Sequence, residues 1–413
     1  MTVVRTRHDR QYLAAGDSAG PPSARNCLLL LPLLLLLLVS ACGIDRGTDD
    51  VTRETLSSGL IRTTWHHLPY NQLTIDTLAI WNIWGEDKEY VFGNITSADG
   101  SAEGFRLVDA GTKKVVRVDV QGNVKHVFGH QGNGPGEFQY PLQIFTRGDE
   151  LWVSDLVLHR YSVFDLTGSF QYIQSWTGIT RYPNESFAIT SADGELYTTR
   201  IASEHRALMH STFVGGAVDT IAMIDYPPLS RTVIEFPGTG PTTMYDPPAY
   251  TPELHWAWTP DERILTVTSA EYQIDVRDLS GRIVQQLVAP TPDLTVTVAD
   301  RTSYMADLAR MYDRSVEEFR RLNPRFESQY PFAERRSAIE RITVDHAGRI
   351  WVLANTVGDT RQRIDLFDED FSYLGSLVDF PFPEAFMPNG ETLFRISNDE
   401  TGADLFFVAR VDG

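Results

Sequence analysis

The chain has 413 residues, with 36 basic and 55 acidic side chains and a formal net charge of −19 at pH 7. A surface this negative repels phosphate backbones, so the composition argues against nucleic-acid binding. It also disfavours adhesion to anionic lipid headgroups through charge alone.

An export signal is the first predicted element. Arginines precede an almost pure leucine run, Leu28–Leu38. That run is too short to cross a hydrocarbon core of about 30 Å and has the length of the apolar region of a secretory signal. A branched residue and two small ones then precede Cys42, the pattern read by the lipoprotein signal peptidase. We predict a lipoprotein signal peptide at residues 1–41 and lipid attachment at Cys42. A plain signal peptide with an accidental cysteine, or an N-terminal anchor helix, is the alternative.

The positions of the two cysteines limit the chemistry that the rest of the chain can perform. The other cysteine, Cys27, would leave with the signal, and Cys42 would carry acyl chains. The remainder would then hold no thiol, which excludes cysteine nucleophiles, cysteine-ligated metals and disulfides. No second apolar run approaches the ~20 residues of a spanning helix. We therefore expect a protein of the cell envelope whose one identified partner is the lipid bilayer, on the periplasmic face or the cell surface.

Residues 42–58 are polar, small and acidic, and we predict that they form a flexible tether behind the lipidated Cys42. The remaining segment, 59–413, is predicted to be a single domain built from repeats.

The repeat is visible where residues 109–122 and 155–168 are aligned. Each copy has an Asp, then a basic residue, an alternating strand and an Asp-x-x-Gly turn. Asp bonds the following backbone in such a turn, and Gly supplies the positive φ. A third copy at 274–281 keeps the strand and the turn, and a fourth at 363–368 keeps the basic residue and the strand. Short strands with a period of ~40–50 residues favour a propeller over a sandwich.

A family resemblance rests on three segments. Residues 128–138, with the run Gly-His-Gln-Gly-Asn-Gly-Pro-Gly-Glu-Phe, are followed by the strands 151–155 and 160–165. Together they resemble an NHL-repeat blade junction, and more closely the six-bladed β-propeller lipoproteins of bacteria. The resemblance is specific over 105–176 and fair over 338–377. It implies an all-β fold with six blades, with five or seven as alternatives.

The predicted blades are 88–128, 140–176, 183–225, 254–288, 338–377, and a sixth that joins the C-terminal strands 393–396 and 405–411 to an N-terminal strand near 73–84. Closing a ring with strands from both ends removes open sheet edges.

Two insertions break the period. Residues 226–250 are rich in Pro, Gly and Tyr, and we predict an irregular loop. Residues 298–325 have apolar side chains at helical spacing and should form a helix that ends at Asn323-Pro324. This helix either packs on the rim of the propeller or acts as a lid or partner-docking element.

Catalytic motifs are scarce. The glycine-rich run Gly129–Gly136 lacks the Gly-Lys-Ser/Thr ending of a phosphate loop. We interpret it as a crossover between blades, with Glu137 bonding backbone within the loop. The histidines show no tight metal-ligand spacing, and there is no serine elbow. We therefore predict no catalytic residue, metal ligand or cofactor.

The candidate ligand-binding residues are Asp155, His159 and Arg160, which lie on a predicted blade loop. The alternative, implied by the resemblance, is that Asp155, its equivalent Asp109 and Arg160 fix the turn and an inter-blade ion pair. Separately, Trp152 and Trp351 are expected at equivalent inward positions of two blades.

Two functions remain. The first is a binding module for a protein, peptide or glycan. The second is a metal-dependent hydrolase or lyase that resembles the six-bladed lactonases or the amidating lyases. Such an enzyme needs side chains from three or more blades around one cation.

Overall fold

The computed structural model describes most of the chain after residue 49. The described residues are 50–69, 71–82, 90–175, 189–190, 195–201, 205–212, 219–225, 227, 230–236, 240–311, 314–357, 363–398 and 403–412. None of the helices among them is long and apolar enough to cross a membrane. Cys42 and the predicted signal peptide lie outside these residues.

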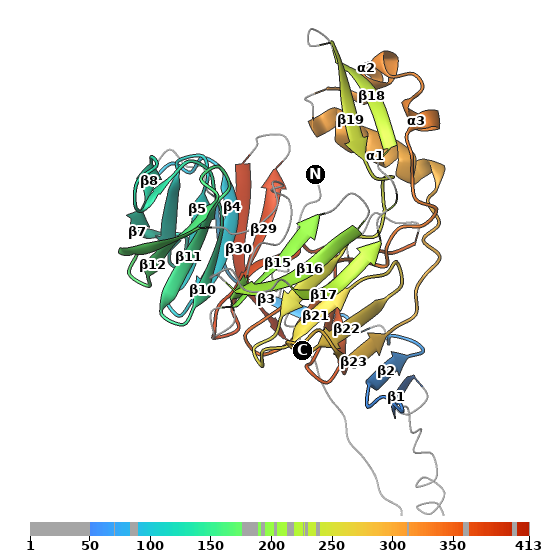
Figure 1. Cartoon of the computed structure of the whole chain (residues 1–413), viewed down its shortest axis with the longest axis horizontal. Coiled ribbons are helices and arrows are strands. Elements are labelled where there is room, and N and C mark those ends of the chain that lie inside the picture. The colour runs from blue at the N-terminus through green and yellow to red at the C-terminus, as the bar shows by residue number, and fades with distance from the viewer. Residues whose placement is uncertain are drawn as a thin grey trace, which may run out of the picture. The chain divides into compact units, whose positions relative to one another are not determined.

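The described residues form six sheets of four or more strands, together with two two-stranded pairs (Figure 1). The first sheet contains β4 (Ile95–Ser101), β5 (Gly104–Asp109), β6 (Lys114–Val118) and β7 (Val124–Phe128). The second contains β10 (Pro141–Arg147), β11 (Glu150–Asp155), β12 (Arg160–Asp165) and β13 (Phe170–Ser175). The third contains β14 (Ile189–Thr190), β15 (Glu195–Ile201), β16 (His205–Thr212) and β17 (Asp219–Asp225).

The fourth sheet contains β20 (His255–Trp258), β21 (Ile264–Val267), β22 (Gln273–Arg277) and β23 (Ile283–Val288), extended by β2 (Ile61–Trp65) and β1 (Val51–Thr55). The fifth contains β24 (Ile339–Val344), β25 (Ile350–Ala354), β26 (Arg363–Phe367) and β27 (Tyr373–Val378). The sixth contains β28 (Pro383–Phe386), β29 (Thr392–Asn398), β30 (Ala403–Asp412) and β3 (Thr74–Asn82). A short parallel pair, β8 (His130–Gln131) and β9 (Glu137–Phe138), joins the first two sheets.

The sheets meet through their first strands. β4 contacts both β10 and β28, and β20 contacts β24. Apolar cores fill the spaces between neighbouring sheets: one joins the fourth and fifth, a second joins the first and sixth, and a third joins the fifth and sixth. Radial sheets packed face to face around their first strands are the arrangement of a propeller. The prediction of an all-β, propeller-like fold is confirmed.

The sixth sheet combines strands from distant parts of the chain. β3 pairs antiparallel with β30, so that Thr74 lies opposite Asp412 and Asn82 opposite Leu405. Trp81 of β3 stacks on Phe406 at 4.8 Å between ring centroids. The predicted union of the C-terminal strands with an N-terminal strand is therefore confirmed.

The expected tether differs from the structure in its second half. Val51–Thr55 forms β1, which pairs with β2, and β2 adds to β23 in parallel. The turn between them closes where Leu56 donates its amide to the carbonyl of Leu60. Trp65 then fixes the hairpin by donating its indole N–H to the carbonyl of Phe371 at 3.0 Å. Small polar residues suggested a linker, but strand pairing along β23 supplies the stability that this segment lacks alone.

The first insertion also differs from the prediction. Within 226–250, β18 (Ser230–Phe236) and β19 (Gly240–Asp246) form a hairpin with seven paired positions. Residues 230–236 contain Thr, Val and Ile in succession, which favour an extended backbone. The irregular-loop prediction gave the prolines of this segment too much weight.

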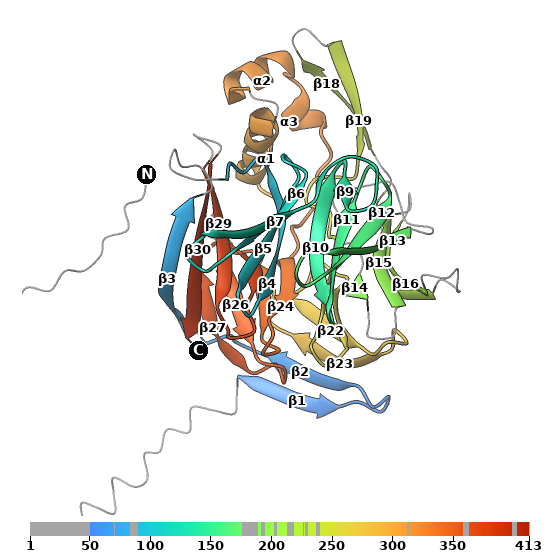
Figure 2. The ribbon, with the colours of Figure 1, turned by 90° about the vertical axis from the view of Figure 1, so that its left-hand side faces the viewer.

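The second insertion contains α1 (Val298–Met311), α2 (Val316–Leu322) and α3 (Phe326–Gln329), where the sequence predicted a helix. Ser315 caps α2 by accepting the amide of Glu318, and Asn323 ends that helix. Apolar side chains of these helices share a small core with Ala249 and Tyr250 of the first insertion. Figures 1 and 2 both show β18, β19 and the helices as one group that projects from the sheets.

Candidate functional site

A cavity of about 390 Å³ lies among the first strands of five sheets. Its lining comes from β4, β10, β20, β24 and the start of β28. The residues are Ser97, Gln143, Ile144, Phe145, His255, Trp256, Ala257, Trp258, Arg341, Ile342, Thr343, Val344, Phe382, Pro383 and Glu384. Sites of a few hundred Å³ with aromatic walls and a few polar groups are typical of small-ligand binding.

The first strands of the first and second sheets, β4 and β10, run in the same direction. Thr96 contacts the carbonyl of Pro141, Ser97 accepts the amide of Ile144, and Thr146 donates to Asp99. The order of these contacts is the same along both strands, so β4 and β10 are parallel. The starts of these two strands therefore lie side by side.

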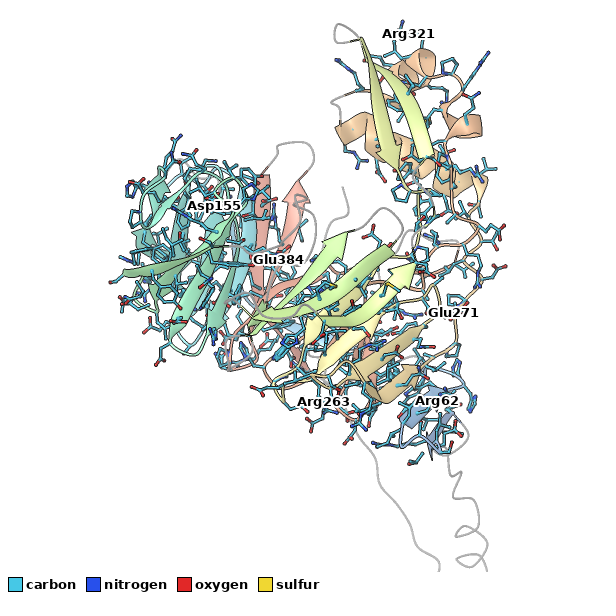
Figure 3. All side chains as sticks on the ribbon, in the orientation of Figure 1. Arg62, Asp155, Arg263, Glu271, Arg321 and Glu384 are labelled. Carbon is cyan, nitrogen blue, oxygen red and sulfur yellow. The ribbon has the colours of Figure 1, made fainter. Side chains whose placement is uncertain are left out.

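Three charged or titratable groups line the cavity from positions near the starts of their strands. His255 is the first residue of β20, Glu384 the second of β28, and Arg341 the third of β24. They come from the fourth, sixth and fifth sheets, and Glu384 is labelled in Figure 3. Gln143 adds an amide from the second sheet. The cavity thus offers both charges and uncharged hydrogen-bonding groups to one ligand.

Aromatic rings form the apolar part of the wall. Phe145, Trp256, Trp258 and Phe382 line the cavity. The Arg341 guanidinium lies 4.9 Å from the centroid of the Phe382 ring. A cation over an aromatic face is held electrostatically, while its N–H groups stay available at the edge.

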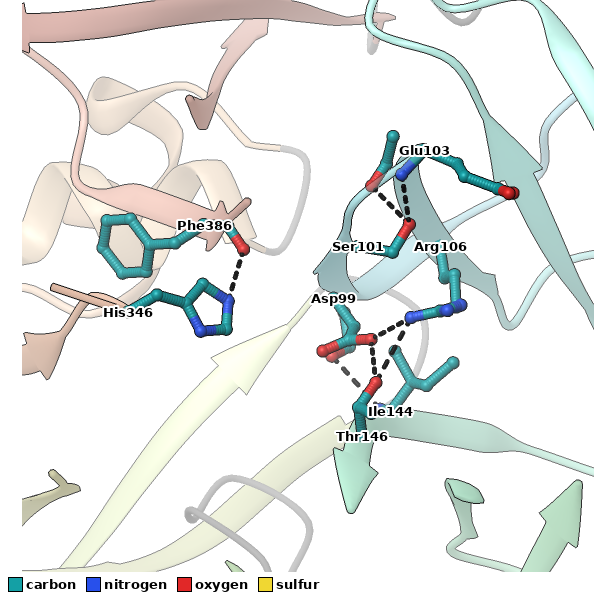
Figure 4. Close-up of polar contacts among 10 residues, drawn as sticks. Asp99, Ser101, Glu103, Arg106, Ile144, Thr146, His346 and Phe386 are labelled. Atoms are coloured by element: carbon teal, nitrogen blue, oxygen red, sulfur yellow. Dashed lines mark hydrogen bonds and ion pairs between the residues drawn. The ribbon is translucent and has the colours of Figure 1, made fainter. Parts of the chain in front are cut away.

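The opposite ends of the strands are tied together around Asp99 (Figure 4). Its carboxylate accepts from the Arg106 guanidinium at 2.9 Å and from the Thr146 hydroxyl at 2.6 Å. Burial raises the pKa of Asp99, and these two contacts oppose that rise. The contacts join the first and second sheets.

The sixth sheet joins the same end. A Cβ added to Gly100 would lie 1.8 Å from the carbonyl oxygen of Phe386, so only glycine permits this approach of β4 to β28. The His346 ring lies 3.1 Å from the same oxygen and comes from the turn after β24. This end of the structure is held by contacts among protein groups, which favours the other end as the ligand site.

The predicted ligand residue Asp155 is fully buried at the end of β11. Its carboxylate accepts four backbone amides, from Gln139 at 2.7 Å, Tyr140 at 3.1 Å, Val157 at 3.0 Å and Leu158 at 2.8 Å. These are the contacts of a residue that fixes a turn, as the alternative interpretation expected. Asp155 is not among the residues that line the cavity.

The other two predicted residues lie beside it. Arg160 donates to the carbonyls of Asn133, Gly134 and Glu137, which holds the crossover loop against the second sheet. The inter-blade ion pair expected for Arg160 is replaced by these carbonyl contacts. His159 is exposed in the turn with φ near +50°. Ligand binding by Asp155, His159 and Arg160 stays a prediction.

Asp109 repeats the arrangement in the first sheet. It accepts the amides of Gly93, Asn94 and Thr112 at 2.9 to 3.1 Å. Burial alone would raise the pKa of Asp109, but the three amides favour the carboxylate and lower it overall. The Asp that repeats in the sequence therefore binds the backbone amides of a loop in both sheets.

The glycine-rich run behaves as a crossover loop. Glu137 accepts the amide of Gly134 at 2.6 Å, which confirms its predicted backbone bond. This hydrogen bond from the Gly134 amide lowers the pKa of the Glu137 carboxyl. A Cβ on Gly132 would lie 1.9 Å from the Glu137 carboxylate, so the loop closes tightly over this side chain.

The sequence analysis missed His255, Arg341 and Glu384 as site residues. They lie on first strands outside the repeat signature, and only the sheet arrangement brings them together. Across the described part of the chain, no three His, Cys, Asp or Glu side chains are grouped so that they could hold a metal ion.

Comparisons with known proteins identify the fold but no family. No family model matches the chain, and no curated protein matches it. A solved member of the DUF4221 family from Bacteroides vulgatus is similar with a TM-score of 0.51 and 11% identity, covering 83% of this chain and 99% of that one. A candidate exported protein from Bacteroides fragilis gives a TM-score of 0.47, 12% identity and coverages of 85% and 99%. A streptogramin B lyase gives 0.41, 10% identity and coverages of 81% and 97%. At these identities the likeness concerns the fold alone, and this chain has that propeller-like fold.

Proposed function

We propose that this chain is a binding module: a closed, NHL-like six-bladed propeller whose central cavity binds a small ligand. Six sheets of at least four strands support six blades, and the pairing of β3 with β30 supports closure. The observation that carries the function is the cavity, where charged, amide and aromatic side chains from separate sheets face one space of about 390 Å³.

The alternative from the sequence is a metal-dependent hydrolase or lyase. It requires carboxylates or imidazoles from three or more blades around one cation. The described cavity residues include one imidazole, His255, and one carboxylate, Glu384. Because they are accompanied by a guanidinium rather than further ligands, binding of an organic molecule is the better-supported function.

Filling the cavity should abolish ligand-induced stabilisation. Thr343→Trp places an indole in the cavity, and Thr74→Trp makes the same change at an exposed position of β3. We expect at least one compound class, from a panel of amino acids, peptides, sugars, nucleotides, fatty acids and divalent cations, to raise the melting temperature of the unmodified chain and of the Thr74 variant. The Thr343 variant should not respond.

Three outcomes would contradict this. No compound class stabilises the chain, every stabilising compound acts equally on the Thr343 variant, or only divalent cations act. The last outcome would favour the hydrolase or lyase function.

We further propose that the module is held outside the cytoplasm by acyl chains on Cys42. The support is the leucine run and the small residues before that cysteine. Each buried methylene of an acyl chain contributes about 0.8 kcal/mol to membrane affinity.

Cys42→Ala should therefore release the chain from the membrane fraction or leave an unprocessed precursor. Fractionation and the mass of the mature N-terminus measure this. Cys27→Ala is the control and should behave like the unmodified chain. Identical processing and partitioning of both variants would refute lipidation at Cys42.

A further inference from the structure

Two side chains of opposite charge line the cavity, and the described residues offer neither of them a hydrogen-bonding or ionic partner. Arg341 lies on β24 and Glu384 on β28, and both line the cavity. Within the described residues neither makes a hydrogen bond or an ion pair, so their charged atoms are more than 4.0 Å apart. Asp99 on β4 behaves differently, since it is paired with Arg106 at 2.9 Å.

The Arg341 guanidinium is chemically suited to a planar anion. Its central carbon lies over the Phe382 ring, 4.9 Å from the centroid. A guanidinium carries parallel N–H donors that match a carboxylate in two-point contact. Glu384 is half-buried on the neighbouring first strand and offers only acceptors at neutral pH.

We propose that the cavity binds a zwitterion, an amino acid or a short peptide, with its carboxylate on Arg341 and its ammonium group on Glu384. This inference rests on the proposed function and names the ligand class of that same cavity. The rings of Trp256 and Phe145 supply an apolar wall for the ligand's side chain. A volume of about 390 Å³ accommodates ligands of this size.

Charge argues against the other ligand classes. The chain carries a net charge of −19, so a ligand with net negative charge is repelled at long range. A neutral sugar could stack on the aromatic wall, but it would displace water from both Arg341 and Glu384 without giving either a counter-charge, which is costly. A zwitterion has no net charge and pairs both groups.

Calorimetry on the detergent-solubilised full chain tests this with matched probes. The probes are the dipeptide Ala-Phe, its N-acetyl form, its C-terminal amide, the tripeptide Ala-Ala-Phe and a mixture of the twenty amino acids. We expect Ala-Phe to bind about tenfold or more tightly than either blocked form, because each block removes one charge-assisted contact. Comparison of the mixture with the two peptides separates free amino acids from peptides as the source.

Two substitutions assign the contacts. The Arg341→Gln variant should bind Ala-Phe and its C-terminal amide with equal affinity, and it should still bind the N-acetyl form more weakly. The Glu384→Gln variant should bind Ala-Phe and its N-acetyl form with equal affinity, and it should still bind the C-terminal amide more weakly. The controls are Arg314→Gln in the loop before α2 and Glu340→Gln, an exposed neighbour of Arg341 on β24. Both should keep the discrimination of the unmodified chain.

The possible failures are distinguishable. If blocked and free dipeptides bind equally, or if either substitution leaves discrimination intact, the zwitterion assignment is wrong. If sugars or nucleotides bind instead and Thr343→Trp abolishes that binding, the cavity still binds a ligand and only its class is wrong. If no compound class binds in the cavity, both proposals fail.

Discussion

Truncating Trp351 to Ala should lower the free energy of unfolding by about 3–5 kcal/mol, the range measured for buried aromatic residues. The indole is fully buried between the fifth and sixth sheets, where it contacts Phe386 and Phe394 at 5.4 and 6.3 Å between centroids. Its N–H also donates to the buried Asp345 at 3.1 Å. The substitution therefore leaves a cavity and removes one of the two donors to the Asp345 carboxylate oxygen, which still accepts from Arg349 at 2.7 Å.

Urea unfolding followed by tryptophan fluorescence and by circular dichroism measures the change. Trp152→Ala, on the second strand of the second sheet, should give a loss of similar size, because that indole is equally buried. The control is Val357→Ala, which removes methyl groups from an exposed side chain. Unchanged unfolding midpoints for both tryptophan variants would contradict the register described above.

Removing the Asp155 carboxylate should lower the free energy of unfolding by a similar amount. Asp155→Ala removes the buried carboxylate that accepts four backbone amides. Each buried donor left unsatisfied costs about 1–3 kcal/mol, and water or relaxation relieves part of this where the amide is only partly buried. We expect a net loss of about 3–5 kcal/mol in the free energy of unfolding. Asp155→Asn retains one carbonyl oxygen, so its free energy of unfolding should fall by an intermediate amount.

The matched control for Asp155 is Asp165→Ala on the next strand. Asp165 also accepts backbone amides, from Thr167 and Ser169, but in an exposed turn where water can replace it. Its loss should cost at most about 1 kcal/mol. Equal losses for the two alanine variants, measured by urea unfolding, would show that the structural role assigned to Asp155 is wrong.

The repeat in the sequence correctly predicted the sheets that contain it. Asp109 and Asp155 recur because each closes the same loop with backbone amides, and local hydrogen bonds of this kind leave a pattern in one chain. The inward tryptophans followed from the same alignment. The pairing of β3 with β30 was predictable because a propeller without it would leave an open edge.

One error occurred where distant pairing outweighs local composition. Val51–Thr55 pairs with β2, and β2 in turn adds to β23, which begins at Ile283, so the sheet that stabilises this segment lies far away in the sequence. The hairpin of β18 and β19 was missed for a different reason: its strands pair locally, but the prolines of this segment suggested a loop.

The cavity residues could not have been predicted from the sequence. Arg341 and Glu384 are single charges on short strands, and each is unremarkable next to the other arginines and acids of the chain. What makes them a pair is the arrangement of the sheets, which places the third residue of β24 and the second residue of β28 at one cavity. Spacing along the chain carries no trace of that relation.

The pairing of Thr74 with Asp412 also has a consequence for biosynthesis. β3 is synthesised about 320 residues before its partner β30. At about 5–20 residues per second, β3 waits on the order of tens of seconds for its partner. During that time its apolar residues and free backbone edge must be shielded by another factor or kept extended. Synthesis cut short before β30 would leave the sixth sheet incomplete and the backbone edge of β3 exposed for pairing with other chains.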